Sequence, residues 1–363
     1  MKGIVYLHAA VGDISVDLVL RRNVTILRGD SGTFKTGLFE IVNGVANEVA
    51  GYTCEASVPG CSFHAPTLYS FDLNKIKKNP DSIVVIDEAT VKKLNNKFAE
   101  AIKTSSAYWI IISRADALMS DIPCSVKEVY ELKIIDNKIV QLPFYHIPDS
   151  NVILPKGASS FYAEGFITED SGSGHKFFSK VFPNAKVAVG AGSNTKVANK
   201  LRKNGATGDN ILVTVDGANY GTCMYGLLTA LVSNRVDSSK VAIYFMESFE
   251  WFVLHSLVFK DDEQLQSILS NPHDYVDSLK HLTHERFYTS LFESKCKELD
   301  FKYEKKEVPD CIYDKDNMDH LLSLIHGVEF PSSKKLIDIN KDLTAEDFAN
   351  IEAFHAKLRE MHS

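Results

Sequence analysis

One loop of the sequence has the composition and spacing of a phosphate-binding site. It consists of Gly29, Asp30, Ser31, Gly32, Thr33, Phe34, Lys35 and Thr36. In the spacing GxxxxGK[ST], backbone N–H groups and a helix N-terminus point at a phosphate, the lysine reaches the β- and γ-phosphates, and the hydroxyl binds Mg²⁺. Phe34 stands where this spacing has its second glycine. We therefore predict that the loop binds ATP, with Thr36 as a magnesium ligand.

Three polar residues further along the chain complete this predicted site. Asp87 and Glu88 directly follow one apolar run, and Ser113 directly follows the next. An aspartate at a strand end can hold the metal with its water shell, and the adjacent glutamate can polarise an attacking water. The sequence thus predicts that Asp87 binds ATP-bound magnesium, that Glu88 is catalytic, and that Ser113 lies beside the γ-phosphate.

A second set of carboxylates follows strands in the second half of the chain. Glu169, Asp216, Glu247 and Glu250 all come just after apolar runs. Because the carboxyl ends of parallel strands share one edge of a sheet, we expect these side chains to converge. Converging carboxylates repel one another unless a divalent cation is bound, and oxygen ligands suit Mg²⁺ or Mn²⁺. This pattern predicts metal-assisted phosphodiester chemistry.

The elements that must position these residues alternate between apolar strands and amphipathic helices. This alternation predicts an α/β fold with two units, each built on a mainly parallel sheet, followed by a helical C-terminal region. The prolines and polar residues between 143 and 155 mark the boundary between the units. The predicted domains are residues 1–145, 155–258 and 259–363. We predict strands at 4–7, 14–18, 24–27, 82–86, 108–112, 165–168, 186–189, 210–215 and 241–245, and helices from 36 and over 91–103, 175–181, 196–203 and 224–232.

The composition restricts the classes of partner. The 363 residues include 47 acidic and 40 basic side chains, which give a formal net charge of -7. No positive field covers the whole protein, so any contact with nucleic acid must be local. Six irregularly spaced cysteines indicate reduced thiols. We expect a cytoplasmic protein with no membrane partner, because the start lacks the features of a signal peptide and no apolar stretch reaches ~18 residues.

The first unit, over about residues 1–135, resembles a P-loop ATPase, and its lead-in strands resemble the amino-terminal part of an ABC-type ATPase head. The sequence between Thr36 and Asp87 contains no LSGGQ-like signature. The resemblance therefore does not extend to the ATP-sandwich dimer that such a signature closes.

The second unit, over about residues 160–258, resembles a TOPRIM domain, and the order of the two units is similar to that of the OLD-family ATPase-nucleases. The resemblance implies that Glu169 is the catalytic or metal-binding glutamate, that Asp216 is the metal-binding aspartate, and that Glu250, with its neighbour Glu247, is the late acidic ligand. Ala218 replaces the second aspartate of the usual Asp-x-Asp, and Asp170 stands where a glycine commonly follows the first glutamate. Asp170 is therefore a candidate for the missing metal ligand.

Nearby residues leave several alternatives open. Glu164 is a rival for the first glutamate, although it precedes the strand. His281 and His284 lie about one helical turn apart, but no third zinc ligand at a useful spacing accompanies them. Five basic residues near the predicted acidic edge can contact phosphates or form a solvated helix face: Lys176, Lys196, Lys200, Arg202 and Lys203.

The function expected from these residues and resemblances is that of an ATP-gated, Mg²⁺-dependent nuclease, with DNA or RNA as the substrate. The family resemblance implies a role in bacterial or phage conflict, as an antiviral defence component, and we expect a homo-oligomer. One alternative is a nucleotide-responsive scaffold that binds a protein partner and has lost catalysis at both sites. Another is an ATPase whose TOPRIM-like half only positions DNA.

Overall fold

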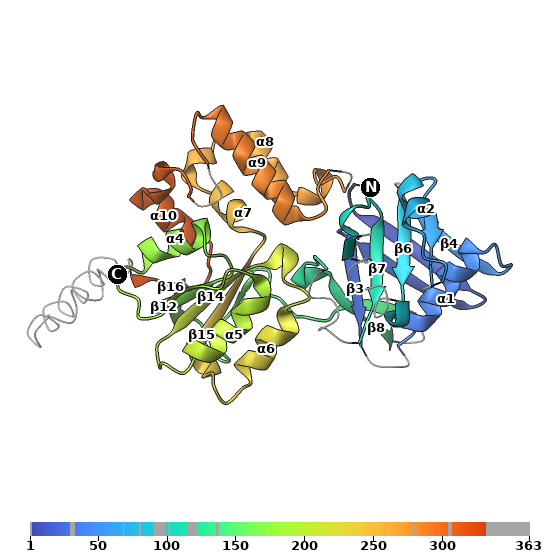
Figure 1. The fold of residues 1–363 in the computed structure, drawn as a ribbon, viewed down its shortest axis with the longest axis horizontal. Helices are drawn as coiled ribbons and strands as arrows, with labels where there is room; N and C mark the ends of the chain where they lie inside the picture. Colours follow the sequence, from blue (N-terminus) through green and yellow to red (C-terminus); the bar gives the residue numbers. More distant parts are fainter. Residues whose placement is uncertain are drawn as a thin grey trace, which may run out of the picture.

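The computed structural model describes residues 2–29, 33–67, 69–79, 81–90, 99–100, 102–114, 122–135, 138–278, 280–303 and 307–331. Asp30, Ser31 and Gly32 of the predicted phosphate loop lie outside these residues, as does most of the predicted helix over 91–103. In the described part the chain forms two large sheets side by side and a small two-stranded sheet, and a helical layer covers one of the large sheets (Figure 1).

The first sheet has nine strands, and its parallel half is deeply buried. Its order is β4-β1-β2-β9-β8-β3-β7-β6-β5, and the strands from β8 to β5 run parallel. Every residue of β3, β6 and β7 is buried, as continuous apolar runs in a parallel sheet require. The strands are β1 (Val5–Val11), β2 (Ile14–Leu20), β3 (Val24–Arg28), β4 (Tyr52–Ala56), β5 (Ser62–His64), β6 (Ser82–Ile86), β7 (Tyr108–Ile112), β8 (Val129–Ile135) and β9 (Lys138–Pro143).

The other half of this sheet is mixed, which the sequence did not predict. β1 pairs antiparallel with β2 and β4, and β8 and β9 form an antiparallel hairpin. Helix α1 (Lys35–Ala46) packs against β1, β4 and β5, and its apolar side joins their core. The short helix α2 (Leu73–Lys78) begins at Asp72, whose carboxylate accepts the N–H groups of Asn74 and Lys75.

The second sheet has the order β10-β15-β14-β12-β13 and is parallel except for β10. Alternate residues of β14 enter different cores, because successive side chains of a strand point to opposite faces. Val213 packs with helices α5 and α6, whereas Leu212 packs with α4 and α7. The elements are β10 (Val152–Ile153), β12 (Gly165–Thr168), α4 (Ser173–Val181), β13 (Ala188–Gly190), α5 (Asn194–Asn204), β14 (Ile211–Asp216), α6 (Met224–Leu231), β15 (Val241–Met246) and α7 (Phe249–Leu254).

The helical region that follows packs onto the second sheet and shares its core. Tyr288 and Phe292 of α9 and Leu321 of α10 are buried in one apolar cluster with Phe252 of α7. The chain then returns to the second unit, where β16 (Val328–Glu329) pairs with β11 (Phe161–Tyr162). The remaining helices are α8 (Glu263–Ser270), α9 (His284–Glu298) and α10 (Lys315–Ser323). Of the helices in the described ranges, none combines the length and the apolar character needed to cross a bilayer.

The two sheet units are joined by a continuous interface. One buried apolar cluster contains Trp109 and Val126 of the first unit together with Tyr220 and Met224 of the second. At this interface the N–H of Gly221 donates to the carbonyl of Cys124 at 2.7 Å. The interface therefore holds the first unit against the unit that carries the second set of carboxylates.

Candidate functional site

The residues of the predicted phosphate site meet at the carboxyl edge of three neighbouring strands. β7 lies between β3 and β6, and the register pairs Leu27 with Ile112 and Ile86 with Ile111. Gly29, Ser113 and Asp87 therefore follow adjacent strands at the same edge. The structure brings these separated parts of the sequence together, and β7, which Ser113 follows, is the middle strand.

Phe34 adopts the backbone conformation that a glycine would normally take in this loop. Its φ is 62°, in the left-handed region, where a residue with a Cβ pays about 1–2 kcal/mol. Its ring lies against the first turn of α1, since a Cβ added to Gly37 would lie 2.6 Å from Phe34 Cε2. The carbonyl of Phe34 accepts the N–H of Leu38 at 3.0 Å. The phenylalanine thus keeps the chain path into the helix, and the contact of its ring with α1 offsets part of the backbone strain.

The lysine and the threonine that follow Phe34 are placed differently. The Lys35 side chain is buried and turned toward the loop, where its Nζ donates to Thr33 Oγ1 and lies 3.6 Å from the position of a Cβ on Gly29. Thr36 is exposed in the first turn of α1. This end of α1 therefore carries a buried cationic group beside the loop and an exposed hydroxyl in its first turn.

The carboxylates across the edge have partners within the protein. Asp87 accepts the N–H of Thr90 at 2.9 Å, which fixes the turn after β6. Glu88 Oε2 lies 3.7 Å from Arg114 Nε. Ser113 is buried, and its N–H donates to the carbonyl of Leu27 at 3.1 Å.

The second predicted site has its centre at Glu169 and Asp216, on neighbouring strands. Glu169 follows β12 and Asp216 ends β14, and the N–H of Asp216 donates to Glu169 Oε2 at 2.9 Å. The pKa of Glu169 is raised to about 8, mainly by burial and in addition by the charges of Glu285 and Asp170, while that hydrogen bond opposes the rise. Burial also raises the pKa of Asp216 well above its usual value, and Glu169 adds the largest charge effect. The two buried carboxyl groups therefore strongly disfavour carrying two negative charges.

Two further glutamates approach this pair from the helical layer. Glu250 lies in the first turn of α7 and accepts the hydroxyl of Tyr303 at 2.8 Å. Glu285 lies in the first turn of α9 and accepts Asn219 Nδ2 at 3.3 Å. Both carboxylates raise the pKa of Asp216. Sequence reasoning missed Glu285, because its only local feature is an acidic residue in the first turn of a helix 69 positions after Asp216.

Asp170 caps the N-terminus of helix α4. Its two carboxylate oxygens accept the N–H groups of Gly174 and His175, each at 3.0 Å, in the first turn of α4. Burial raises the pKa of Asp170, although these hydrogen bonds oppose the rise. The residue proposed to supply the missing metal ligand is thus a helix cap beside the site.

Glu247 is directed away from this group of carboxylates and into the interface with the first unit. Its two oxygens accept Arg22 Nη1 at 2.9 Å and Nη2 at 2.8 Å. Burial alone raises the pKa of Glu247, but the charge and hydrogen bonds of Arg22 outweigh it and lower the pKa to about 2. Glu164 lies at the opposite end of β12, where it accepts the N–H of Asn210 at 3.0 Å.

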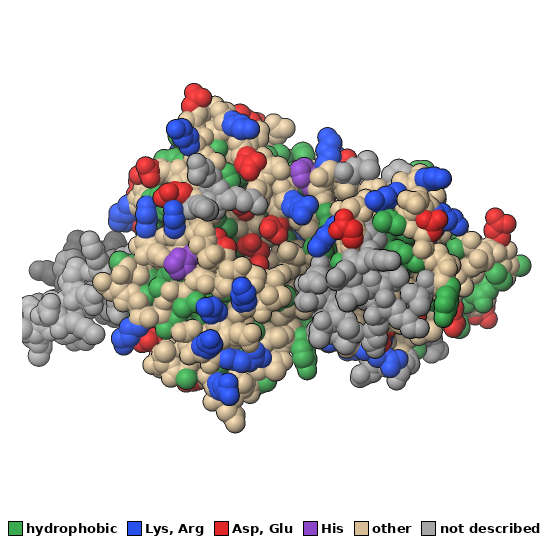
Figure 2. Space-filling model, viewed as in Figure 1, with side chains coloured by type: hydrophobic (Ala, Val, Ile, Leu, Met, Phe, Trp, Pro, Cys, Tyr) green, Lys and Arg blue, Asp and Glu red, His purple; other side chains and the backbone are tan. Residues whose placement is uncertain are grey.

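The surroundings of the acidic pair combine opposite charges. Figure 2 shows acidic side chains gathered in a recess between the helical layer and the second sheet, with lysines and arginines on the neighbouring surface over α5 and α6. The hydroxyl of Tyr220 is buried and has no hydrogen-bond partner among the described residues, and burial raises its pKa, to which the charge of Glu169 adds. Hard oxygen donors and an unsatisfied hydroxyl fit Mg²⁺ or Mn²⁺ with its water shell. Within the described ranges, no group of three or more His, Cys, Asp or Glu side chains is close enough to hold a metal ion.

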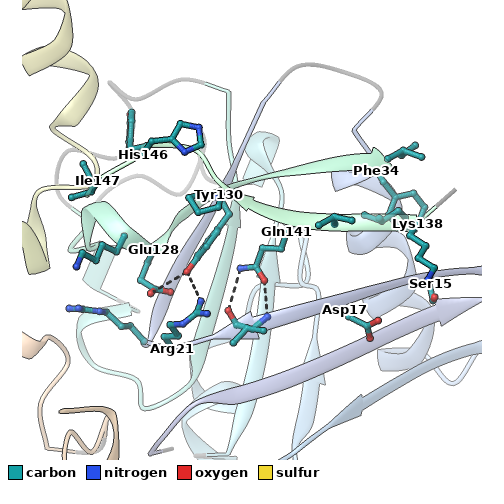
Figure 3. A pocket seen from close by; sticks show the side chains of 18 of the residues that line it. Ser15, Asp17, Arg21, Phe34, Glu128, Tyr130, Lys138, Gln141, His146 and Ile147 are labelled. Atoms are coloured by element: carbon teal, nitrogen blue, oxygen red, sulfur yellow. Dashed lines mark hydrogen bonds between the residues drawn. The ribbon is translucent and has the colours of Figure 1, made fainter. Parts of the chain in front are cut away.

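A large cavity lies elsewhere, on the first sheet, and sequence reasoning did not find it. It has a volume of about 1340 Å³ and runs along β2, β8 and β9 from Phe34 to His146 (Figure 3). In the wall of this cavity the side-chain amide of Gln141 in β9 takes the place of a backbone pairing with β2. It accepts the N–H of Val19 at 2.7 Å and donates to the carbonyl of Val19 at 3.3 Å. Deeper in the cavity, Tyr130 donates to Glu128 at 3.4 Å. Burial raises the pKa of Glu128 to about 7.

Comparisons with protein-family models and with curated proteins gave no match to this chain.

Proposed function

We propose that the protein is an ATP-binding, divalent-metal-dependent nuclease of the cytoplasm, in which the first unit binds the nucleotide and the acidic edge of the second unit cleaves a phosphodiester bond. The observation that carries the proposal is the buried pair of Glu169 and Asp216 at the carboxyl ends of adjacent parallel strands, joined by a hydrogen bond of 2.9 Å, with the charges of Glu250 and Glu285 acting on Asp216 from the helical layer. Buried carboxyl groups that raise one another's pKa are typical of a site that a bound cation completes.

The residues of this edge have distinct proposed roles. Asp216 and Glu169 would hold Mg²⁺ or Mn²⁺, with Glu250 or Glu285 as a further oxygen ligand. The bound ion would supply Lewis-acid stabilisation of the charge that develops on the phosphate. The hydrogen bond from the N–H of Asp216 orients the Glu169 carboxyl, and the basic surface over α5 would hold the flanking phosphates.

Nucleotide binding by the first unit is supported by the arrangement of its residues. Lys35 inside the loop, Thr36 at the start of α1, and Asp87 with Glu88 after β6 occupy one edge. The left-handed conformation of Phe34 supports nucleotide binding, because this residue has the positive φ that a glycine would adopt at this position of the loop. In this proposal Glu88 polarises the attacking water and ATP turnover gates cleavage.

A second candidate function is a nucleotide-responsive scaffold that binds a protein partner. It is favoured by the placement of Glu247 and Asp170, two carboxylates expected at the metal that instead bind Arg22 and cap α4. A scaffold would bind ATP and show no cleavage.

One experiment separates the two. Supercoiled plasmid and total cellular RNA are incubated with the protein and Mg²⁺ or Mn²⁺, with and without ATP, beside Asp216→Asn and Lys35→Ala. The nuclease proposal predicts cleavage that Asp216→Asn abolishes and that depends on ATP through Lys35. Binding of ATP without cleavage under every condition would contradict it and favour the scaffold. Asp237→Asn is the matched control, because Asp237 is an exposed aspartate in a turn of the same unit.

A further inference from the structure

A small polar cavity lies where the three parts of the chain meet, next to the acidic edge. Its volume is about 270 Å³. The first unit contributes Lys103 and Pro123, and the second unit contributes Asn194 and Asn219. The helical region contributes the remaining lining residues, which are Leu282, Thr283, Glu285 and Arg286.

The cavity is adjacent to the proposed cleavage site through two hydrogen-bonded residues. Asn219 follows Asp216 by three positions and donates its side-chain amide to Glu285 at 3.3 Å. The charge of Glu285 acts on both Glu169 and Asp216. A group bound in the cavity would therefore lie beside the proposed metal ligands.

The lining favours an anion with several oxygen acceptors. Lys103 and Arg286 are exposed cationic side chains, and together they exceed the single negative charge of Glu285. The side-chain amide of Asn194 adds a donor, and its helix, α5, begins at the wall of the cavity. A lysine and an arginine beside amide donors are the groups that bind a phosphate.

We propose that this cavity binds a phosphate of the nucleic-acid strand that is cut at the acidic edge, next to the scissile bond. The inference depends on the proposed nuclease function and specifies how its substrate is held. It also gives the first unit a direct part in substrate binding, because Lys103 belongs to the chain segment after Asp87 and Glu88.

The segment before α9 supports a fixed cavity, since several contacts tie it to the first unit. Ser278 Oγ donates to the carbonyl of Ser106 at 2.8 Å, and His273 Nδ1 lies 3.0 Å from the carbonyl of Arg21. These contacts hold the segment before α9 against the first unit, so that Arg286 and Lys103 line the same cavity.

The test measures binding of a fluorescent single-stranded oligonucleotide to the full-length protein in EDTA, by fluorescence anisotropy over a range of salt concentrations. We expect Lys103→Gln and Arg286→Gln each to raise Kd about 5- to 10-fold. Each should also reduce the slope of log Kd against log salt by about 0.7, the value for one lost phosphate contact on a single strand. The control is Lys297→Gln, an exposed residue of α9 about 16 Å along the helix from Arg286 at 1.5 Å per residue.

The outcomes distinguish this inference from the proposed function. If both variants bind as the wild type does, with unchanged salt slopes, the inference is overturned even where Asp216→Asn abolishes cleavage. If the variants lose affinity only for inorganic phosphate or ATP, used as competitors, the cavity binds a free phosphate and the strand assignment is wrong. Weaker oligonucleotide binding with a reduced slope supports the inference even where the wild type does not cut.

Discussion

The buried ion pair between Arg22 and Glu247 crosses the interface between the two units, where loss of one partner is expected to be costly. Arg22 belongs to the turn between β2 and β3, and Glu247 follows β15, so 225 residues separate them. Their side chains are 11% and 15% exposed, and they share two hydrogen bonds of 2.8 and 2.9 Å. We predict that Arg22→Met strongly destabilises the folded protein, because it leaves the Glu247 carboxylate buried without its cation.

The magnitude follows from the pKa of Glu247, which falls from 4.5 to about 2 although burial alone raises it. At about 1.4 kcal/mol for each pKa unit, this corresponds to about 3 kcal/mol of folding free energy at pH 7. Removal of one partner from a buried pair generally costs about 3–5 kcal/mol, which agrees. Because the folded pKa is the lower one, this stability is present above pH ~4.5 and is lost as the pH falls toward 2.

The assay is urea unfolding followed by far-UV circular dichroism at pH 7. Arg22→Met should lose about 3 kcal/mol, while Arg235→Met, at an exposed arginine, should stay within about 0.5 kcal/mol of the wild type. The double variant with Arg22→Met and Glu247→Leu should recover most of the loss, since no buried charge remains unpaired. A single variant as stable as the wild type, or a double variant as unstable as the single one, would refute the reasoning.

Three further predictions test local features. In EDTA, Glu169→Gln should be more stable than the wild type at pH 8 but not at pH 4. Because the folded pKa of Glu169 is about 8, the folded wild type keeps a proton that the unfolded chain releases near pH ~4.5, and wild-type stability falls by about 1.4 kcal/mol per pH unit as the pH rises from there to 8. Thermal unfolding at both pH values measures this difference, and a pH-independent difference would exclude the effect. Phe34→Ala should be less stable than Phe34→Gly by about 1 kcal/mol, because alanine keeps the cost of a positive φ; equal melting temperatures would contradict this. Gly221→Ala should lower the free energy of unfolding in urea by about 2 kcal/mol or more, because its Cβ would lie 2.6 Å from the carbonyl oxygen of Ser125. Gly226→Ala should not destabilise the protein, because this glycine lies in a helix and the nearest atom to its Cβ is 4.0 Å away. Equal stability of the two glycine variants would contradict the predicted clash.

Local sequence patterns predicted the elements whose own residues show a clear apolar run or motif spacing. The apolar runs at 82–86 and 108–112 are the fully buried strands β6 and β7, because strands covered on both faces need continuous apolar residues. Helix α1 starts where the phosphate-loop spacing requires a helix. The carboxylates Glu169 and Asp216 were found because each directly follows a strand of this kind.

The features that sequence reasoning missed depend on partners far away in the chain. The hairpin of β8 and β9 lies between β2 and β3 in the first sheet, and no local sequence pattern predicts this strand order. Glu247 was expected at the metal, but the position of Arg22 in space decides its partner. Asp170 caps α4 because the helix begins within reach of its carboxylate. Glu285 reaches the acidic edge only because the helical layer folds back over the second sheet.

We expect the acidic edge of the second unit to bind a divalent cation. Titration with Mn²⁺ at pH 8, followed by electron paramagnetic resonance, on the wild type, on Asp216→Asn and on Lys35→Ala in the absence of nucleotide measures this binding. The wild type should bind one Mn²⁺, Asp216→Asn should lose it, and Lys35→Ala should retain it. Equal Mn²⁺ binding by the wild type and Asp216→Asn would contradict this expectation.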